Sequence, residues 1–552
     1  MNKTRRTKMH RLALIGAGIA ALGSGSAMAA SPGAAETLTA STVQNQLATA
    51  PGEADDLPVS TFYQRLLSPA AWQTTERVEA LTDALRTLKN DGLAPEDYLA
   101  PSGSSTTLMQ AFNRSRDGGA EARAAFDVRA TRALLRALEH LQRGRLDPTE
   151  QVAGWETARP ARHYSMARVA AAVADDDIRQ ALALARPDTR AYRQLQDALG
   201  RYRDLATRAR QHRSAALVPG EKVLRRGDEH DAVVTLRRRL AYWGLDEALQ
   251  GDPDAYAPID AQAPRRERFD ADLEAVVKRF QRRHLLDADG VVGGKTRRAL
   301  NASLTSHVDA LALNLERARW MQPIMARRPG VWVDIAGYRM HYTRPDGERW
   351  SSKVIVGSAR RETPVIHSSI TRFTVNPTWT VPPTIRREDV LPRLKHDTDY
   401  LASRNIQVLS PDGARLDPEA VNWQAPGNVM LRQSAGPHNP LGRVVVRFPN
   451  DKLVYLHDTP SRGLFNRDRR ALSSGCVRVE GVRELARMLL HDTNSRYRLS
   501  ELLKRGKSDL NVRLPESVPV ALVYLTAWPD AGGHITFRPD IYGRDEALRR
   551  AL

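Results

Sequence analysis

Cysteine is nearly absent from this chain, and long apolar runs are absent beyond the N-terminus. Cys476 is the single cysteine among 552 residues, so no disulfide can form within the chain. A lone cysteine is a buried apolar residue, an intermolecular link or a reactive thiol. The residues around Cys476 must decide between these three readings.

The first residues have the pattern of a targeting segment. Five basic residues precede a short apolar run, Leu12 to Leu22, and Ala27-Met28-Ala29 follows it. This pattern predicts a cleavable signal peptide over residues 1–29 and export of a soluble protein. An uncleaved anchor is the competing reading, but eleven residues fall short of the roughly 20 needed to span a bilayer.

Acidic residues are too few to balance the basic ones, and the net charge is +19. Removing the five positive charges of the predicted signal peptide leaves +14. A basic surface favours an anionic partner. For an exported protein, peptides and polymers of the cell envelope fit that role better than nucleic acid, and a basic surface without a specific partner is the alternative.

The length predicts several domains, because 552 residues exceed what one hydrophobic core supports. Residues 30–56 are rich in small and polar residues and predict a flexible lead-in. Residues 57–218 show helical periodicity and predict a scaffold, completed by helical residues 302–328. We expect Trp320 in that second segment to pack back on the first.

Residues 219–301 predict three short helices separated by glycine turns. Phe280-Gln281 lies within one of these helices, and the unit ends in the pattern Asp289-Gly290-x-x-Gly293-x-x-Thr296. The unit resembles the peptidoglycan-binding type 1 module. The alternative is a helical unit that packs on its neighbours and binds nothing.

From residue 329 to about residue 545 the period changes to that of strands. We expect strands at 331–335, 339–342, 353–356, 444–448, 453–457, 521–526 and 535–537. Residues 383–441 interrupt this pattern and predict an insertion, which is either a lid or a packing appendage. The fold class is therefore multidomain α+β.

The residues around Cys476 favour a reactive thiol. Cys476 lies in a Ser-Ser-Gly turn, nineteen residues after His457. A thiol attacks as its thiolate, so it needs a base such as histidine. Strand alternation puts Tyr455 on the same face as His457. Gly475 lets the backbone approach a substrate and turn N–H groups toward an oxyanion, and Arg478 could bind a carboxylate or favour the thiolate.

These residues resemble the YkuD-type L,D-transpeptidase motif, in which a histidine precedes a Ser/Thr-x-Gly-Cys-x-Arg segment. Many relatives carry histidine where this chain has Ser474, whereas the large multidomain periplasmic members do not. Further matching segments are Asn376 to Pro382, Gly442 and residues 518–543. The resemblance implies that Cys476 is the nucleophile and His457 its base, and that Gly475 helps to form the oxyanion hole. We expect the side chains that contact substrate to be Tyr455, Ser474, Arg478, Trp379 and Asn376.

The resemblance implies a reaction that builds 3→3 cross-links in peptidoglycan. Cys476 would release D-alanine from a donor tetrapeptide and form a thioester, which a diamino-acid side chain on an acceptor stem then attacks. No metal or organic cofactor is implied. Carbapenem-type inhibitors would acylate the same thiol, wall-synthesis proteins are candidate partners, and the compartment would be the periplasm.

Two other functions compete with this one. A carboxypeptidase or endopeptidase would use water as the acceptor of the same acyl-enzyme. A non-catalytic wall-binding scaffold would not need the cysteine and histidine together. At the level of single residues, Arg478 could instead be a structural ion-pair partner.

Overall fold

The computed structural model describes residues 40–49, 58–66, 68–100, 106–151, 155, 160–211, 217–220, 222–243, 267–326, 330–397 and 399–552. The predicted signal peptide, residues 1–29, lies outside the described residues. Within the lead-in that we predicted to be flexible, α1 (Ala40–Thr49) is a helix. Val43 of α1 is buried and packs in the core of the helical block. The prediction of a flexible lead-in is therefore wrong for residues 40–49, because this packing holds the helix in place.

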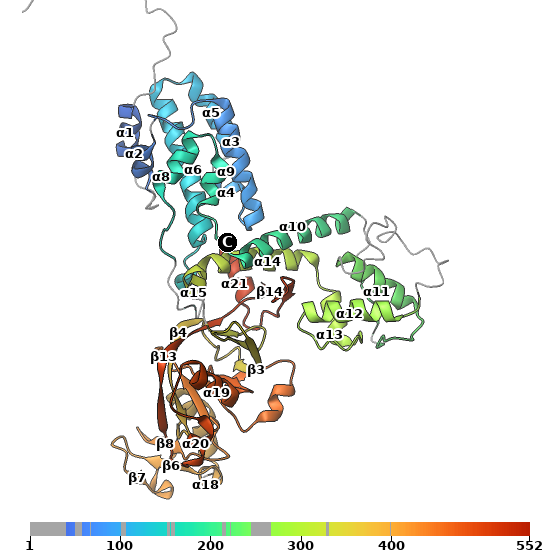
Figure 1. The fold of residues 1–552 in the computed structure, drawn as a ribbon, viewed down its shortest axis with the longest axis vertical. Coiled ribbons are helices and arrows are strands. Elements are labelled where there is room, and N and C mark those ends of the chain that lie inside the picture. The colour runs from blue at the N-terminus through green and yellow to red at the C-terminus, as the bar shows by residue number, and fades with distance from the viewer. Residues whose placement is uncertain are drawn as a thin grey trace, which may run out of the picture.

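A block of helices forms the upper part of the molecule (Figure 1). Its longest helix, α6 (Ala120–Arg143), contributes buried residues on most of its turns, and the other helices surround it. These are α2 (Val59–Arg65), α3 (Thr75–Arg86), η1 (Thr87–Asp91), α4 (Glu96–Leu99), α5 (Leu108–Asp117), α8 (Met166–Ala174) and α9 (Ile178–Ala183). The short helix α7 (Pro148–Gln151) follows α6 along the chain. The block contains the helical region predicted from residue 57 onwards.

Two helices in the middle of Figure 1 connect the parts of the molecule, α10 (Arg190–Gln211) and α14 (Leu304–Trp320). The indole Nε1 of Trp320 donates to the Leu146 carbonyl at 3.1 Å, so α14 does return to the first block. The sequence grouped α10 with that block. Instead, Leu195 and Leu199 of α10 pack in one core with residues of α14 and of the small module.

Buried polar residues of α14 reach the end of the chain. The Asn314 side-chain amide donates to Thr526 Oγ1 at 2.7 Å, and Arg317 pairs with Asp545 at 2.5 Å. Asp545 lies in the last helix, α21 (Arg544–Ala551). The helix α15 (Gln322–Ala326) then leads from α14 into the β-rich domain.

The small module has the three helices that the sequence predicted: α11 (Asp231–Tyr242), α12 (Ala271–Arg283) and α13 (Gly294–Leu300). The Gln281 side chain donates to Asp289 Oδ1 at 2.7 Å and to Thr296 Oγ1 at 3.2 Å, and it accepts from the Gly290 N–H at 2.9 Å. The signature residues therefore hold the loop between α12 and α13. Glycan binding by the module stays a prediction.

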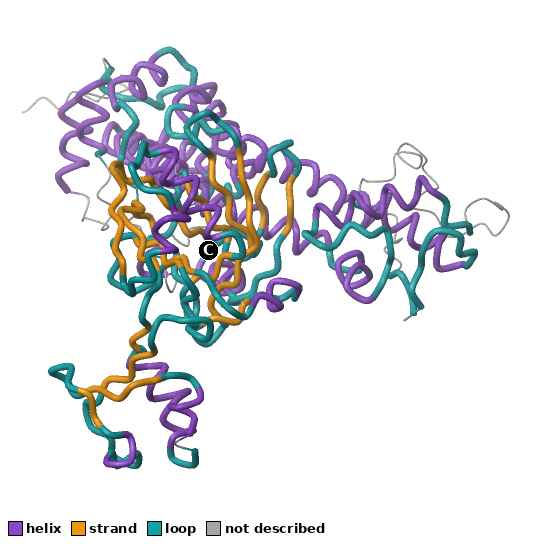
Figure 2. Tube along the Cα trace, turned by 60° about the horizontal axis from the view of Figure 1, so that its bottom comes forward, coloured by secondary structure: helices purple, strands orange, loops and turns teal. Residues whose placement is uncertain are grey.

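The β-rich domain is built on a nine-stranded sheet in the order β11-β3-β12-β10-β9-β4-β13-β1-β2. Because β2 also pairs with β3, the sheet closes on itself (Figure 2). The strands are β1 (Val331–Asp334), β2 (Arg339–Thr343), β3 (Arg349–Gly357), β4 (Ile366–Val375), β9 (Val444–Arg447), β10 (Leu456–His457), β11 (Ala471–Ser473), β12 (Val477–Val479) and β13 (Leu510–Val523).

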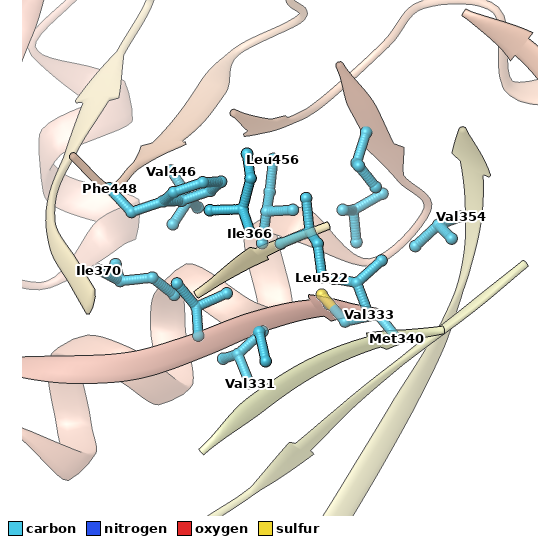
Figure 3. Packing of buried hydrophobic residues seen from close by; sticks show 14 of the residues in the cluster. Val331, Val333, Met340, Val354, Ile366, Ile370, Val446, Phe448, Leu456 and Leu522 are labelled. Atoms are coloured by element: carbon cyan, nitrogen blue, oxygen red, sulfur yellow. The ribbon is translucent and has the colours of Figure 1, made fainter. Parts of the chain in front are cut away.

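Inward-facing side chains from most strands fill this closed sheet. Figure 3 shows Val333, Met340, Val446 and Leu456 meeting in its interior, and all four are buried. The helices α19 (Val482–Asp492) and α20 (Leu499–Lys504) add apolar residues to the same core. Successive strand residues point to opposite faces, so polar residues that alternate with this core lie on the outside.

The inserted segment forms a second, four-stranded sheet in the order β5-β8-β6-β7, at the lower end of Figure 1. Its elements are β5 (Trp379–Thr380), α16 (Pro383–Ile385), the π-helical turn η4 (Arg386–Val390), α17 (Leu391–Leu394), α18 (Asp399–Ser403), β6 (Ile406–Leu409), β7 (Arg415–Leu416), η5 (Pro418–Ala420) and β8 (Met430–Gln433). A separate small core around Trp423 and Leu431 holds it together. Its role as a lid stays a prediction.

The remaining elements are η6 (Arg462–Asn466) and the hairpin of β14 (Ala527–Pro529) with β15 (Ile535–Phe537), which packs near α10 and α14. Among the described residues, none of the helices has both the length and the apolar character needed to cross a bilayer.

Candidate active site

The strand register brings the predicted catalytic residues to one face of the closed sheet. In the parallel pair β10–β12, Leu456 lies beside Val477 and His457 beside Arg478. Leu456 and Val477 are fully buried in the core. By alternation, His457 and Arg478 point outward, and so does Cys476, which directly precedes β12.

The His457 ring is buried and has a defined tautomer. Its Nδ1 lies 2.6 Å from the Asp458 carbonyl oxygen. A carbonyl oxygen can only accept, so Nδ1 carries the proton and Nε2 presents a lone pair. Burial, and secondarily the Arg478 cation, lower the pKa of His457 to about 4. The imidazole is therefore neutral at pH 7 and can act as a base.

The Cys476 thiol is half-buried, and its Sγ donates weakly to the Leu453 carbonyl at 3.6 Å. Burial raises its pKa, against the opposing effects of the Tyr455 backbone N–H and the cations of Arg478 and Arg447. In the resting protein the thiol and the imidazole on this face are therefore both neutral. Proton transfer must accompany attack on a substrate.

A set of hydrogen bonds shapes the turn that holds the thiol. Gly475 has a φ of 110°, which side chains rarely tolerate. Thr363 Oγ1 donates to the Gly475 carbonyl at 2.8 Å, while Ser473 Oγ accepts from the Gly475 N–H at 3.2 Å and donates to the Cys476 carbonyl at 2.5 Å. The Gly475 N–H would thus have to leave Ser473 to serve an oxyanion hole, a role that stays a prediction.

Thr363 is held in turn by residues that the motif does not contain. Its Oγ1 accepts from the Gly357 N–H at 2.8 Å, and its own N–H donates to the Tyr542 hydroxyl at 3.1 Å. That hydroxyl donates to the Gly357 carbonyl at 2.8 Å. Sequence reasoning placed Tyr542 in a matching segment but gave it no role, because nothing in the local pattern connects it with Cys476.

Ser474 is exposed and connects the turn to the insertion. Its Oγ accepts from Arg361 at 2.9 Å. The same guanidinium pairs with Glu388 at 2.7 Å and Asp389 at 2.5 Å, both in η4. The sequence predicted substrate contact for Ser474. The structure gives it a partner within the protein, and substrate contact stays a prediction.

Arg478 has no ion-pair partner among the residues that the structure describes, and its Nε is buried without a hydrogen bond. A structural ion pair, the alternative considered from sequence, is therefore not formed in this part of the chain. Burial lowers the pKa of Arg478, against the favourable effect of the nearby Cys476 thiolate form. Arg478 is half-buried, and a partly desolvated cation without a carboxylate partner suits a site that binds or generates an anion.

A cavity of about 470 Å³ opens between the closed sheet and the insertion, and it reaches the predicted site at Tyr455; His457, Cys476 and Arg478 do not line it. Trp379 and Tyr455 both line it, as do several arginines. Asn376, in contrast, does not line it. Its side chain binds Arg443 at 3.2 Å, and its φ of 48° suits the turn after β4. Substrate contact by Asn376 stays a prediction.

Family models match three segments of the chain. Residues 58–199 match the "Scaffold domain", residues 229–300 the "Putative peptidoglycan binding domain", and residues 328–502 the "L,D-transpeptidase catalytic domain". The last segment contains His457 and Cys476. The first ends where α10 continues as a link to the rest of the molecule.

A curated protein of Haemophilus influenzae, "Putative L,D-transpeptidase", is 37% identical over 244 residues. The match covers 44% of this chain and 49% of that protein, so the chain spans about half the length of the relative. Together with the matched segments, this similarity identifies a multidomain chain that carries a YkuD-type L,D-transpeptidase catalytic domain and a peptidoglycan-binding type 1 domain.

Proposed function

We propose that this protein forms 3→3 cross-links in peptidoglycan through a thioester on Cys476. The observation that carries the proposal is the shared outward face of His457, Cys476 and Arg478. Tyr455 on the same face lines a cavity at the boundary with the insertion. Acyl transfer needs a nucleophile, a base and a group that stabilises negative charge. The Cys476 thiol, the neutral His457 ring with a lone pair on Nε2 and the Arg478 cation supply these three groups.

The first half of the reaction transfers the donor stem to sulfur. Cys476 Sγ attacks the carbonyl carbon of the third stem residue while His457 Nε2 takes the thiol proton. The carbonyl π electrons move onto oxygen and return as the C–N bond breaks. His457 gives its proton to the departing D-alanine nitrogen, which leaves a thioester and a neutral imidazole.

The second half forms the cross-link. His457 takes a proton from the side-chain amine of a diamino acid on a second stem as that amine attacks the thioester. The C–S bond breaks, the proton returns to sulfur, and an amide joins the two stems. In this scheme Arg478 stabilises the thiolate each time it forms, because its charge lowers the pKa of the Cys476 thiol more than the charge of Arg447 does.

The matched domains act on peptidoglycan, which supports a location at the cell wall or in the periplasm. Export by cleavage after residue 29 belongs to the proposal. So do the donor tetrapeptide, the diamino-acid acceptor, inhibition by carbapenems and cooperation with wall-synthesis proteins.

The test combines intact-mass detection with product analysis. The full chain is incubated with a tetrapeptide donor, with and without an amine acceptor, and compared with Cys476→Ala. We expect a thioester adduct and cross-linked product with the unsubstituted chain alone, and an unchanged circular dichroism spectrum for the variant. Cross-linking by Cys476→Ala would refute the mechanism. Release of D-alanine without cross-linking, even with acceptor present, would favour the hydrolytic activity.

A further inference from the structure

Three arginines form a row across neighbouring strands of the closed sheet. Arg513 of β13 lies opposite Arg372 of β4, and Arg372 lies opposite Arg447 of β9. These three residues are called the arginine row below. Tyr455 comes next on the same line across the sheet, with its ring 4.9 Å from the Arg447 guanidinium. Cys476 follows Tyr455 on that line.

The register behind the row is continuous. The next residues along the same strands, Val512, Phe373, Val446, Leu456 and Val477, are paired one with the next. All five are buried in the core. The arginine row, Tyr455 and Cys476 therefore form the neighbouring line of side chains on the outer face.

Such a row is unfavourable in the free protein. Like charges directly opposite each other across antiparallel strands destabilise a sheet. Within the described part of the chain, no carboxylate pairs with Arg372, Arg447 or Arg513. The hydrogen bond of Arg447 Nε goes instead to Thr374 Oγ1, at 2.9 Å. Three aligned cations without counter-charges point to an anion supplied from outside.

The cavity beside the catalytic face gives that anion a place. Arg372 and Arg447 line it from the closed sheet, and Arg432 lines it from β8 of the insertion. Asp509 is the one carboxylate in its lining, and both of its oxygens accept hydrogen bonds from Thr378 at 2.8 Å. The lining therefore carries three positive charges against one negative charge.

We propose that the arginine row and this cavity bind the free carboxylates of the stem peptide, so that the enzyme selects acidic stems over amidated ones. The proposal deepens the proposed function and rests on it for the placement of a stem carbonyl at Cys476. Bidentate guanidinium–carboxylate pairing supplies the selectivity, because a carboxamide has neither the charge nor two acceptor oxygens.

The dimensions agree with this placement. Neighbouring strands lie about 4.8 Å apart, so Arg447 lies about 10 Å from Cys476 along the row, and Arg513 about 19 Å. An extended peptide advances about 3.3–3.6 Å per residue. When the carbonyl group of the third stem residue lies at Cys476, the first two residues of the stem therefore come within reach of Arg447 and Arg372. The carboxylate of the second stem residue is among the groups that these arginines can bind.

Binding is measured on the full chain carrying Cys476→Ala, so that chemistry does not interfere. The probes are two synthetic tetrapeptides that differ only in their inner carboxyl groups. One has free carboxylates on its γ-linked glutamate and on a dicarboxylic diamino acid, and the other has carboxamides there. We expect the free peptide to bind at least about tenfold more tightly, which corresponds to 1.4 kcal/mol.

Arg372→Gln, added to this chain, should remove most of that preference, and Arg372→Lys should retain part of it. Arg339→Gln is the matched control, because Arg339 is an exposed, outward-facing arginine on β2. Raising the ionic strength from about 0.05 M to 0.5 M should weaken binding of the free peptide alone, because salt screens exposed charges. This measurement needs no arginine variant and so does not depend on how such a variant folds.

Equal binding of the two peptides, or an unchanged preference in Arg372→Gln, would overturn the proposal. These outcomes are independent of the chemistry at sulfur. If the free peptide binds selectively yet the chain with Cys476 forms no thioester from it, the arginine row stands and the proposed function fails.

Discussion

Replacing Arg478 with glutamine should lower the reactivity of the thiol without destabilising the fold. Arg478 is the cation that acts on both members of the catalytic pair. It favours the thiolate of Cys476 and disfavours protonation of His457. Its Nε is nevertheless buried without a partner, so the folded protein bears a desolvation cost that serves function rather than stability.

The size of the effect follows from the charge that is removed. A nearby opposite charge shifts a pKa by about 1–3 units, so Arg478→Gln should raise the thiol pKa by about one unit or more. Below that pKa, each unit lowers the thiolate fraction tenfold. His457, with a pKa of about 4, is protonated in about one molecule in a thousand at pH 7, so an ion pair with it contributes little.

The single cysteine makes the assay direct. Alkylation of Cys476 by iodoacetamide, followed by mass spectrometry from pH 6 to 10, should be about tenfold slower at pH 7 in Arg478→Gln. The midpoint of its pH profile should be higher, and its melting temperature should be equal or higher. Arg487→Gln, which removes an exposed charge on α19, is the control. Unchanged alkylation together with a lower melting temperature would show that Arg478 is structural and refute the reasoning.

Two further predictions concern other parts of the structure. Arg361→Ala should remove the link between η4 and the turn that holds Cys476. Amide hydrogen exchange in Arg386–Val390 should then become faster by up to about fivefold, because partly exposed ion pairs contribute about 1 kcal/mol or less. Arg387→Ala, which loses a more exposed ion pair, should leave this exchange rate unchanged. Acid should weaken the core shared by the small module and α14, because burial lowers the pKa of His284 to about 3 and of His307 to about 4. The folded form then binds fewer protons than the unfolded form, so stability falls as the pH drops from about 6.5 toward 4. The loss of melting temperature between pH 7 and 4.5 should be smaller in His307→Phe, and equal losses would contradict this reading.

The sequence predicted where His457 and Cys476 lie on the sheet because the signals for both are local. His457 ends a short apolar strand, and Cys476 lies in a turn with a glycine whose φ of 110° explains the choice of residue. Strand alternation then needs only the pairing of β10 with β12 to bring both to one face. The relative positions of the two side chains thus follow from a pattern that a single sequence contains.

The arginine row could not be predicted in the same way. It depends on β4, which has few alternating apolar residues, and on β13, which contains Pro515 and Pro519. Proline argues against a central strand. The structure accommodates Pro515 in a register shift between Arg513 and Val518 and keeps Pro519 paired with Ser369. No local pattern reveals which strands become neighbours when the pairing joins residues as far apart in the chain as Arg372 and Arg447, or Arg372 and Arg513.

The long-range bonds of α14 constrain how the chain folds. Asn314 and Arg317 find Thr526 and Asp545 more than two hundred residues later. Until those residues have been synthesised, the helix between the module and the catalytic domain holds an uncompensated guanidinium in what will become its core. Loops of that length close slowly. The linking helix therefore reaches its final packing only after α21 has been made.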